Sequence, residues 1–388
     1  MTSQAAPARP GTHVRSGALT RTLAMMIKEF VQLRRDRLTF ATMIFIPVVQ
    51  LLLFGYAINT TPRHLPTAVL VHEENDLTRS VLAAISNTSY FSLTRVVRSE
   101  AEMDHLMRSG SILFGIEIPA GFERSVRRGD RPALLVAADA SDPVAAGTAL
   151  ASLEGTVWSA LSRDRGLPET VQSVPAFEIR QHRRYNPAAV TSLNIVPGLL
   201  GTILTMTMLI FTALSVTREI ERGTMESLLS MPIRPLEIML GKIAPYILIG
   251  FMQAALILLL AVFLFAVPVA GSVLLLALLS TLFIATNLSI GYTFSTIAQN
   301  QLQAVQMSFM FFLPNILLSG FMFPYAGMPG WAQVVGEALP LTHYIRIVRG
   351  IMLKGADLYD LQLEALALGG LMLVAMTLAV RRFRKTLD

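Results

Sequence analysis

The chain has 388 residues, of which 53% are hydrophobic and only 15% are charged. Its mean hydropathy of +0.55 lies above the range of ordinary soluble domains, so the composition indicates an integral membrane protein. A sequence pI of about 9.8 also occurs in nucleic-acid-binding proteins. Here the excess Lys and Arg flank the predicted membrane spans, where cations meet anionic lipid. We therefore expect a lipid membrane as a partner and no nucleic acid. The absence of cysteine excludes disulfides and thiol chemistry.

Residues 1–38 are predicted to form a cytoplasmic N-terminus that contains an amphipathic helix lying in the membrane interface. Arg21, Lys28, Gln32 and Arg35 fall on the polar side of that helix. Its apolar arc consists of Leu19, Leu23, Met26, Ile27 and Phe30. The alternative is a bent extension of the first span. That span, 39–58, is interpreted as a retained signal anchor, because a long charged region precedes it and no small-x-small cleavage pattern follows.

Six apolar segments are long enough to cross a bilayer. They lie at about 39–58, 193–216, 243–267, 273–296, 305–323 and 362–380. An even number of spans places both termini and the loop 217–242 on the same side. Seven Lys and Arg in residues 1–38, four in the loop and four in the last eight residues identify that side as the cytoplasm.

Residues 59–192 are too polar to span a membrane and are predicted to form an extracytoplasmic α/β domain. Strand-like runs occur at 67–71, 112–118, 134–138 and 177–181, and amphipathic helical stretches at 76–86, 99–108 and 144–164. The domain contains acids and histidines, but no nucleophile–His–acid spacing. His72-Glu73-Glu74 has the residue types of a metal site, but we interpret it as a solvated loop after a strand. We interpret the domain as a docking or gating surface.

The loop 217–242 is charged and interrupted by prolines, and it separates two long apolar runs. Gly223 is expected to end the preceding helix and Thr224 to cap a short new one, with Glu226 in its first turn. Pro235 can begin the helix that follows. The short helix would present an apolar stripe of Met225, Leu228 and Leu229.

Several strings in this loop carry a family resemblance. They are Arg218-Glu219, Glu221-Arg222-Gly223-Thr224-Met225-Glu226, Leu228-Leu229, Pro232-Ile233, Glu237-Ile238 and Gly241-Lys242. Together they resemble the cytoplasmic loop of bacterial ATP-binding-cassette export permeases of the type 2 class. The resemblance implies a coupling helix that docks on a separate ATPase chain, which binds ATP-Mg; this chain itself is expected to hold no cofactor. It implies an interface formed by Arg222, Gly223, Thr224, Met225, Glu226, Leu228 and Leu229. An ordinary amphipathic connector is the alternative.

The same resemblance implies an elbow helix at the N-terminus and a dimer with a second permease copy or a paralogue. It extends to the string Ile116–Arg124 of the outer domain and to Pro340-Leu341-Thr342-His343-Tyr344 and Arg349-Gly350. Residues 324–350 contain too many prolines and glycines for a span and too much apolar surface for a free loop. They are predicted to form a re-entrant outer segment before the last span. His343 within it suits either a proton carrier or a structural hydrogen-bonding role.

The predicted spans contain no Asp, Glu, Lys, Arg or His in their interiors, and Glu364 lies near the outer end of the last one. Ion-coupled transporters usually place such groups at membrane depth, so their absence argues against secondary transport. The chain also lacks a Gly-x-x-x-x-Gly-Lys-[Ser/Thr] motif and hence an ATP site of its own. Asn194, Thr205 and Asn315 could line a pathway, although hydrogen bonding between helices also explains them. An uncharged conduit favours an amphiphilic substrate.

The sequence therefore predicts an α-helical polytopic membrane protein with six transmembrane helices in the bacterial inner membrane. An α/β extracytoplasmic domain is inserted between helices 1 and 2, and residues 193–388 form the five-helix remainder. The predicted function is that of the permease subunit of an ATP-driven exporter, which is not itself an enzyme. A membrane scaffold or sensor that uses residues 59–192 is the alternative; a membrane-embedded enzyme would show catalytic groups near a bilayer face. The choice between homodimer and heterodimer, and the presence of a periplasmic adaptor, stay open.

Overall fold

The computed structural model describes residues 63–142, 144, 146–151, 153, 177–223 and 235–385. Contacts divide the chain into Met1–Val48 and Val49–Asp388, and every described residue belongs to the second unit. The predicted N-terminal helix, the first span 39–58 and the predicted coupling helix lie outside the described residues.

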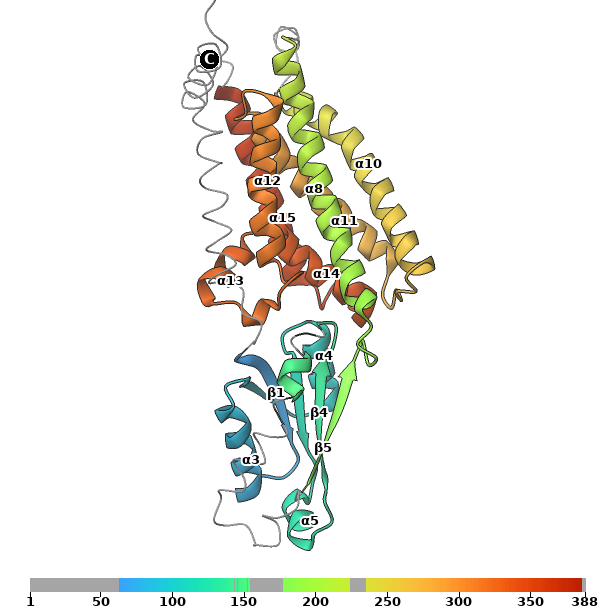
Figure 1. Ribbon diagram of the computed structural model, residues 1–388, viewed down its shortest axis with the longest axis vertical. Coiled ribbons are helices and arrows are strands. Elements are labelled where there is room, and N and C mark those ends of the chain that lie inside the picture. Colours follow the sequence, from blue (N-terminus) through green and yellow to red (C-terminus); the bar gives the residue numbers. More distant parts are fainter. Residues whose placement is uncertain are drawn as a thin grey trace, which may run out of the picture. The chain divides into compact units, whose positions relative to one another are not determined.

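A five-stranded mixed sheet has the strand order β2-β1-β3-β4-β5 (Figure 1). Neighbouring strands are parallel except for the antiparallel pair β3–β4. The strands are β1 (Leu65–Val71), β2 (Phe91–Val97), β3 (Phe114–Ile118), β4 (Ala133–Asp139) and β5 (Glu178–Arg184). The helices of this domain include α3 (Asp76–Asn87), α4 (Glu100–Arg108) and α5 (Phe122–Arg128). Four strands and both α3 and α4 agree with the sequence patterns; β2 and α5 were not anticipated.

Alternation along the strands gives the sheet two apolar faces. Ile116 and Val136 lie in a core shared with α3 and α5, whereas Leu70 and Ala137 lie in a second core against α4. A side chain at Gly115 would place its Cβ 2.3 Å from Sδ of Met103 on α4. The glycine therefore leaves room for the Met103 side chain against the sheet.

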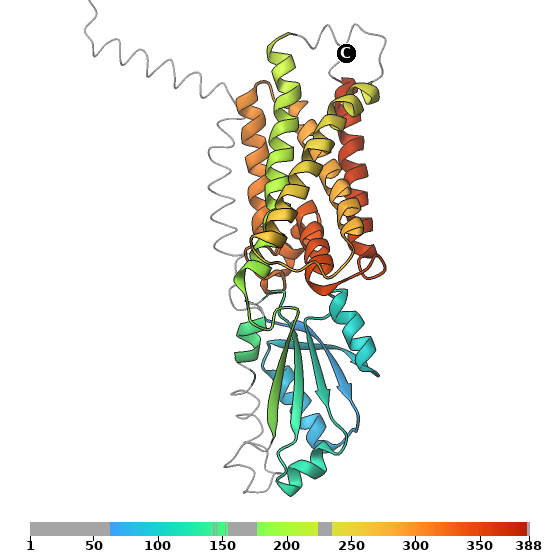
Figure 2. The same ribbon diagram turned by 90° about the vertical axis from the view of Figure 1, so that its right-hand side faces the viewer.

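The helical part contains long helices that run alongside one another in both views (Figures 1 and 2). They are α8 (Thr191–Glu221), α10 (Pro235–Phe263), α11 (Val273–Ser295), α12 (Gln301–Leu318) and α15 (Gln362–Lys385). Among the described residues, α8, α10, α11 and α15 are long and apolar enough to cross a membrane. The predicted fifth span corresponds to α12, which has 18 residues, ends at Leu318 and is not among these four. The predicted end of a helix at Gly223 and start at Pro235 agree with α8 and α10.

Small residues bring the long helices close together. A Cβ at Gly291 of α11 would lie 2.8 Å from the backbone oxygen of Leu209 on α8, and a Cβ at Gly250 of α10 would lie 2.9 Å from Ile284. The stacked rings of Phe283 and Tyr344, 3.9 Å between centroids, fill the core beside them. Hydroxyl groups within the helices mostly donate to their own backbone, as Thr212 does to the oxygen of Met208 at 2.8 Å.

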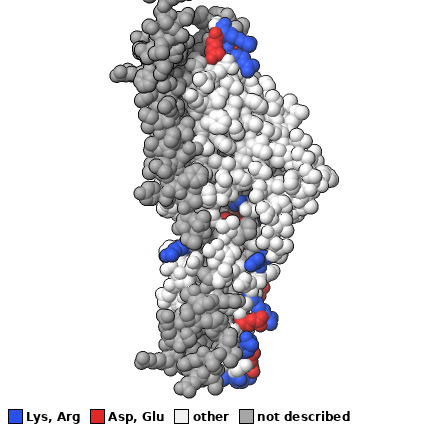
Figure 3. Space-filling view, viewed as in Figure 1, with Lys and Arg blue, Asp and Glu red and all other residues white. Residues whose placement is uncertain are grey.

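Two of these helices leave wide apolar faces uncovered within this chain. Only 17% of the membrane window of α10 and of α15 is buried. On the face drawn in Figure 3, charged side chains are almost absent from the helical part between its two ends. Such a surface is compatible with lipid or with another apolar protein surface, but not with water. The exposed side chains include Leu248, Met252, Leu256 and Phe263 of α10, and Leu363, Leu366, Leu373 and Leu378 of α15.

Between α12 and α15 the chain forms a 3-10 turn, η2 (Tyr325–Gly327), and two shorter helices, α13 (Gly330–Glu337) and α14 (Pro340–Lys354). Two short helices were expected in 324–350 from the density of proline and glycine. Pro340 occupies the first turn of α14 and Gly355, at φ 66°, ends it. A membrane-embedded position for this segment stays a prediction.

Candidate functional site

The residues predicted for ATPase coupling are described only in part. Arg222 and Gly223 are exposed directly after α8, and Gly223 has a φ of 68°, a left-handed conformation that stops a helix. Thr224, Met225, Glu226, Leu228 and Leu229 lie outside the described residues. The end of α8 is tied to the start of α12, because the carboxylate of Glu221 accepts hydrogen bonds from the backbone and side-chain nitrogens of Gln301.

The three residues proposed to line a pathway make contacts inside the helical part. Thr205 is fully buried, and its hydroxyl donates to the Gly201 oxygen at 2.8 Å. Asn315 is also buried and accepts a 3.3 Å hydrogen bond from the backbone nitrogen of Leu341. Asn194 accepts one from Arg349 at 2.6 Å. The contacts of Asn194 and Asn315 fasten α8 and α12 to α14, whereas that of Thr205 lies within α8. A pathway role for the three residues stays a prediction.

His343 on α14 belongs to a cluster of charged groups. Its Nδ1 lies 2.6 Å from a carboxylate oxygen of Glu364, and its Nε2 lies 2.9 Å from the backbone oxygen of Glu337. The backbone oxygen of Glu337 can only accept, so Nε2 donates to it, and Nδ1 faces the carboxylate of Glu364. Burial lowers the pKa of His343, but the hydrogen bond to Glu364 and that to the Glu337 oxygen outweigh it and raise the pKa above 6.5.

Arg346 completes this cluster. Its guanidinium donates to Glu337 at 2.6 Å and to Glu364 at 3.0 Å, and it lies 4.5 Å from the centre of the Tyr325 ring. Burial raises the pKa of Glu337, but hydrogen bonds from Arg346 and from Tyr325 outweigh it, so the pKa lies below its ordinary value. Two cations and two carboxylates therefore balance, and they hold α13, α14 and the start of α15 together.

A second set of contacts joins the sheet domain to α14 and the segment after it. The ammonium of Lys354 pairs with the carboxylate of Asp139 at the end of β4, and their side chains are 8% and 1% exposed. Nδ1 of His105 on α4 lies 2.9 Å from Asp360, and the His105 ring stacks on Tyr359 with centroids 5.7 Å apart. These contacts fix one end of the sheet against the outer helices.

Arg349, one turn before Lys354 on α14, is also buried, with 9% of its surface exposed. Its guanidinium donates to the backbone oxygen of Gly320 at 3.1 Å and to the side-chain oxygen of Asn194 at 2.6 Å. Its Nε is buried and has no hydrogen-bond partner. Among the described residues, no carboxylate lies within ion-pair distance of it, in contrast to Arg346 and Lys354.

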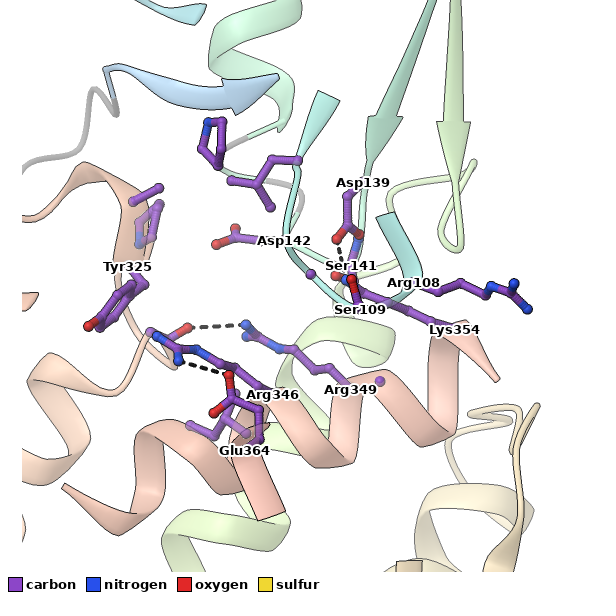
Figure 4. A pocket seen from close by; sticks show the side chains of 18 of the residues that line it. Arg108, Ser109, Asp139, Ser141, Asp142, Tyr325, Arg346, Arg349, Lys354 and Glu364 are labelled. Atoms are coloured by element: carbon purple, nitrogen blue, oxygen red, sulfur yellow. Dashed lines mark hydrogen bonds and ion pairs between the residues drawn. The ribbon is translucent and has the colours of Figure 1, made fainter. Parts of the chain in front are cut away.

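Arg346, Arg349, Lys354 and Asp139 line a cavity of about 430 Å³ between the sheet domain and α14. Figure 4 shows Arg349 extending from α14 beside Arg346, with Asp139, Ser141 and Asp142 on the side of the sheet domain. The lining also includes apolar side chains such as Leu113, Ile345 and Leu361. The volume lies within the range of small-molecule pockets.

Long apolar helices with a mixed-sheet domain fastened to them define a multi-pass membrane protein. Residues 37–381 match the family model described as ABC-2 family transporter protein, and the chain belongs to this family. It is therefore a transmembrane permease subunit of an ABC transporter and not an enzyme, and the ATPase is a separate chain.

Proteins from Escherichia coli K12 are similar over most of their length. The probable multidrug ABC transporter permease YbhS is 32% identical over 86% of this chain and 89% of its own. The probable multidrug ABC transporter permease YbhR is 27% identical over 85% of this chain and 89% of its own. The inner membrane transport permease YhhJ is 32% identical over 74% of this chain and 76% of its own.

The sequence analysis did not identify Arg349, Arg346 and Lys354 as parts of a site. Arg349 was noted only as part of a family string, and Lys354 was not considered. The cations at positions 346 and 349 of α14 are a detectable signal, because residues three apart share a helix face. The partners of the three cations, Asp139, Asn194 and Glu364, are remote in sequence, so the pairing needs the tertiary structure.

Proposed function

We propose that this permease moves a hydrophobic or amphiphilic substrate out of the cytoplasm or the inner leaflet. An ATP-binding-cassette ATPase would dock on the loop 217–242 and supply the energy, with ATP-Mg bound to that partner. The proposal includes six spans, both termini in the cytoplasm, an outer sheet domain, and a dimer with a second permease copy or a paralogue in the bacterial inner membrane.

The observation that carries the proposal is the distribution of charge along the long helices. In the described chain, Asp, Glu, Lys, Arg and His occur in α8, α10, α11, α12 and α15 only toward the helix ends. Ion- and proton-coupled transporters usually place ionisable groups at membrane depth, where the coupling ion binds. The energy is therefore expected to enter from outside the membrane, through the partner ATPase that the family uses.

The same charge distribution supports the class of substrate. Buried polar groups in these helices, such as Thr205, Asn287 and Asn315, are uncharged among the described residues. A pathway lined by them would accept an amphiphile more readily than a hydrophilic ion. Relatives named as probable multidrug permeases agree with a lipophilic substrate.

A membrane sensor that uses the sheet domain is the second candidate. Lys354 of α14 pairs with Asp139 of the sheet domain, and His105 of the sheet domain pairs with Asp360 in the segment after α14. These contacts support a sensor role, because they connect the sheet domain directly to the helical part. Membership of a transporter family makes this role an addition to transport rather than a replacement.

The coupling proposal is tested in inverted membrane vesicles that contain the permease and its ATPase. We expect ATP-dependent accumulation of a lipophilic dye inside these vesicles, which corresponds to export from the cell. Leu228→Asp should abolish accumulation and weaken co-purification of the ATPase, because desolvated apolar anchors dominate such interfaces. Leu228→Met, which keeps an apolar side chain of similar volume, is the matched control and should retain both. Full accumulation by Leu228→Asp would contradict the assigned docking site.

A further inference from the structure

We propose that the cavity between the sheet domain and α14 binds an oxyanion, the phosphate or carboxylate group of a small amphiphile, on the guanidinium of Arg349. This binding site is additional to the proposed transport function and does not depend on its direction or energy source.

The first argument is the incomplete set of partners around Arg349. The side chain has five N–H donors and stays charged in proteins. Only the Gly320 oxygen and the Asn194 oxygen accept from it in the described structure, and both are neutral. The buried Nε has no acceptor. A buried charge is costly unless it is paired, so the arrangement lacks an anion.

The second argument is that neighbouring charges already have other partners or act only from a distance. Arg346 is bound by Glu337 and Glu364, and Lys354 by Asp139. Asp142 and Asp139 raise the pKa of Arg349 through space, but burial, which lowers it, is the larger effect. The nearby carboxylates therefore do not compensate the buried guanidinium. An incoming anion would do so at shorter range.

The third argument is the charge and size of the cavity. Its lining contains four cations, Arg108, Arg346, Arg349 and Lys354, and three carboxylates, Asp139, Asp142 and Glu364. One positive charge is left over when His64 is neutral. The planar fork of an arginine matches two oxygens of a phosphate or carboxylate. A volume of about 430 Å³ leaves room for more than the anionic group alone, and the apolar lining suits the adjoining part of an amphiphile.

The experiment uses the purified full-length permease in neutral detergent, without ATPase or nucleotide, so that its failure is separate from failure of the transport proposal. Isothermal titration calorimetry measures binding of inorganic phosphate, of dihexanoyl phosphatidate and of uncharged dihexanoylglycerol. We expect dihexanoyl phosphatidate to bind and dihexanoylglycerol not to bind. Arg349→Gln should weaken phosphatidate binding by at least about tenfold, because bonds to a charged group are strong.

A second pair of variants protects the test against misfolding of Arg349→Gln. Ser109 lines the same cavity near Lys354 (Figure 4). Ser109→Glu leaves Arg349 in place and adds a negative charge, whereas Ser109→Gln adds similar bulk without charge. Binding should be at least about tenfold weaker in Ser109→Glu than in Ser109→Gln, because like charges repel more strongly where water is partly excluded. Arg79→Gln, which changes an exposed cation of α3, should bind as the unchanged protein does.

Binding of inorganic phosphate with the same dependence on Arg349 would support the proposal and show that the anionic group alone is sufficient. Binding of phosphatidate alone would support it with a lipid headgroup as the source. Absence of binding by both anions, equal binding of dihexanoylglycerol, or affinities indifferent to both Arg349→Gln and Ser109→Glu would overturn it.

Discussion

Removing the ammonium of Lys354 should loosen the sheet domain at the ends of β4 and β5. The Asp139 side chain is 1% exposed, and in Lys354→Met its carboxylate loses the paired cation. Among its described partners, only the backbone nitrogen of Ser141 then remains, at 3.0 Å. Breaking a buried pair by removing one partner typically costs about 3–5 kcal/mol. The double variant Lys354→Met with Asp139→Asn removes the uncompensated charge and should recover most of this loss.

Hydrogen–deuterium exchange of the full-length protein in nanodiscs measures the effect on β4 and β5. A loss of that size corresponds to exchange faster by on the order of a hundredfold to a few thousandfold. Arg180→Met on β5 is the matched control, because its pair with Glu178 has side chains 66% and 53% exposed and should contribute at most about 1 kcal/mol. The reasoning would be refuted if β4 and β5 of Lys354→Met exchanged at rates within about threefold of those in the unchanged protein. It would also be refuted if the double variant exchanged as fast as Lys354→Met.

Three further predictions concern helix packing, pH and topology. Gly291→Ala should lower the melting temperature, at a cost of about 1–3 kcal/mol, because the added Cβ would lie 2.8 Å from the Leu209 oxygen. Gly369→Ala should not lower the melting temperature, because a Cβ at Gly369 would have nothing within 4 Å. Equal melting temperatures of the two variants would contradict the close approach of α11 to α8. His343 faces Glu337, Glu364 and Arg346, and its pKa is raised above 6.5. The protonated His343 ring therefore stabilises the fold below pH 6.5, and this stabilisation is lost as pH rises through the raised pKa. The melting temperature should therefore fall between about pH 6 and pH 9 by more in the unchanged protein than in His343→Gln, and parallel curves would exclude this role. On cells with a permeabilised outer membrane, an impermeant thiol reagent should label a cysteine that replaces Ser173 and should not label a cysteine that replaces Ser227. The reverse pattern would contradict the topology.

The long apolar helices and most of the sheet domain were predictable because each depends on local patterns. Long runs of apolar residues locate α8, α10, α11 and α15, and short strand-like runs locate β1, β3 and β4. Strand β2 was missed because its sequence Phe91–Val97 places Thr94 and Arg95 in the middle and exposes Val96, as is typical of an edge strand within the described sheet. Helix α5 has only seven residues, too few for a clear period.

The cavity was not predictable for a different reason. The sequence gives the positions of Arg346, Arg349 and Lys354 on one helix, but whether each is paired depends on side chains from other elements. Asp139 is 215 residues from Lys354, and Asn194 is 155 residues from Arg349. The string Arg349-Gly350 was noticed as a family feature, yet the lack of a carboxylate beside Arg349 is a property of the tertiary structure. Conversely, the predicted coupling helix depends on a sequence match and on residues outside the described ones.

Transport in proteoliposomes tests the central claim most directly. Vesicles containing the permease and its ATPase should move a lipophilic dye when ATP is supplied, and should continue to do so with a protonophore present. Replacing the catalytic glutamate of the ATPase should stop this movement. Transport by the permease alone, driven by an imposed pH gradient, would contradict the account.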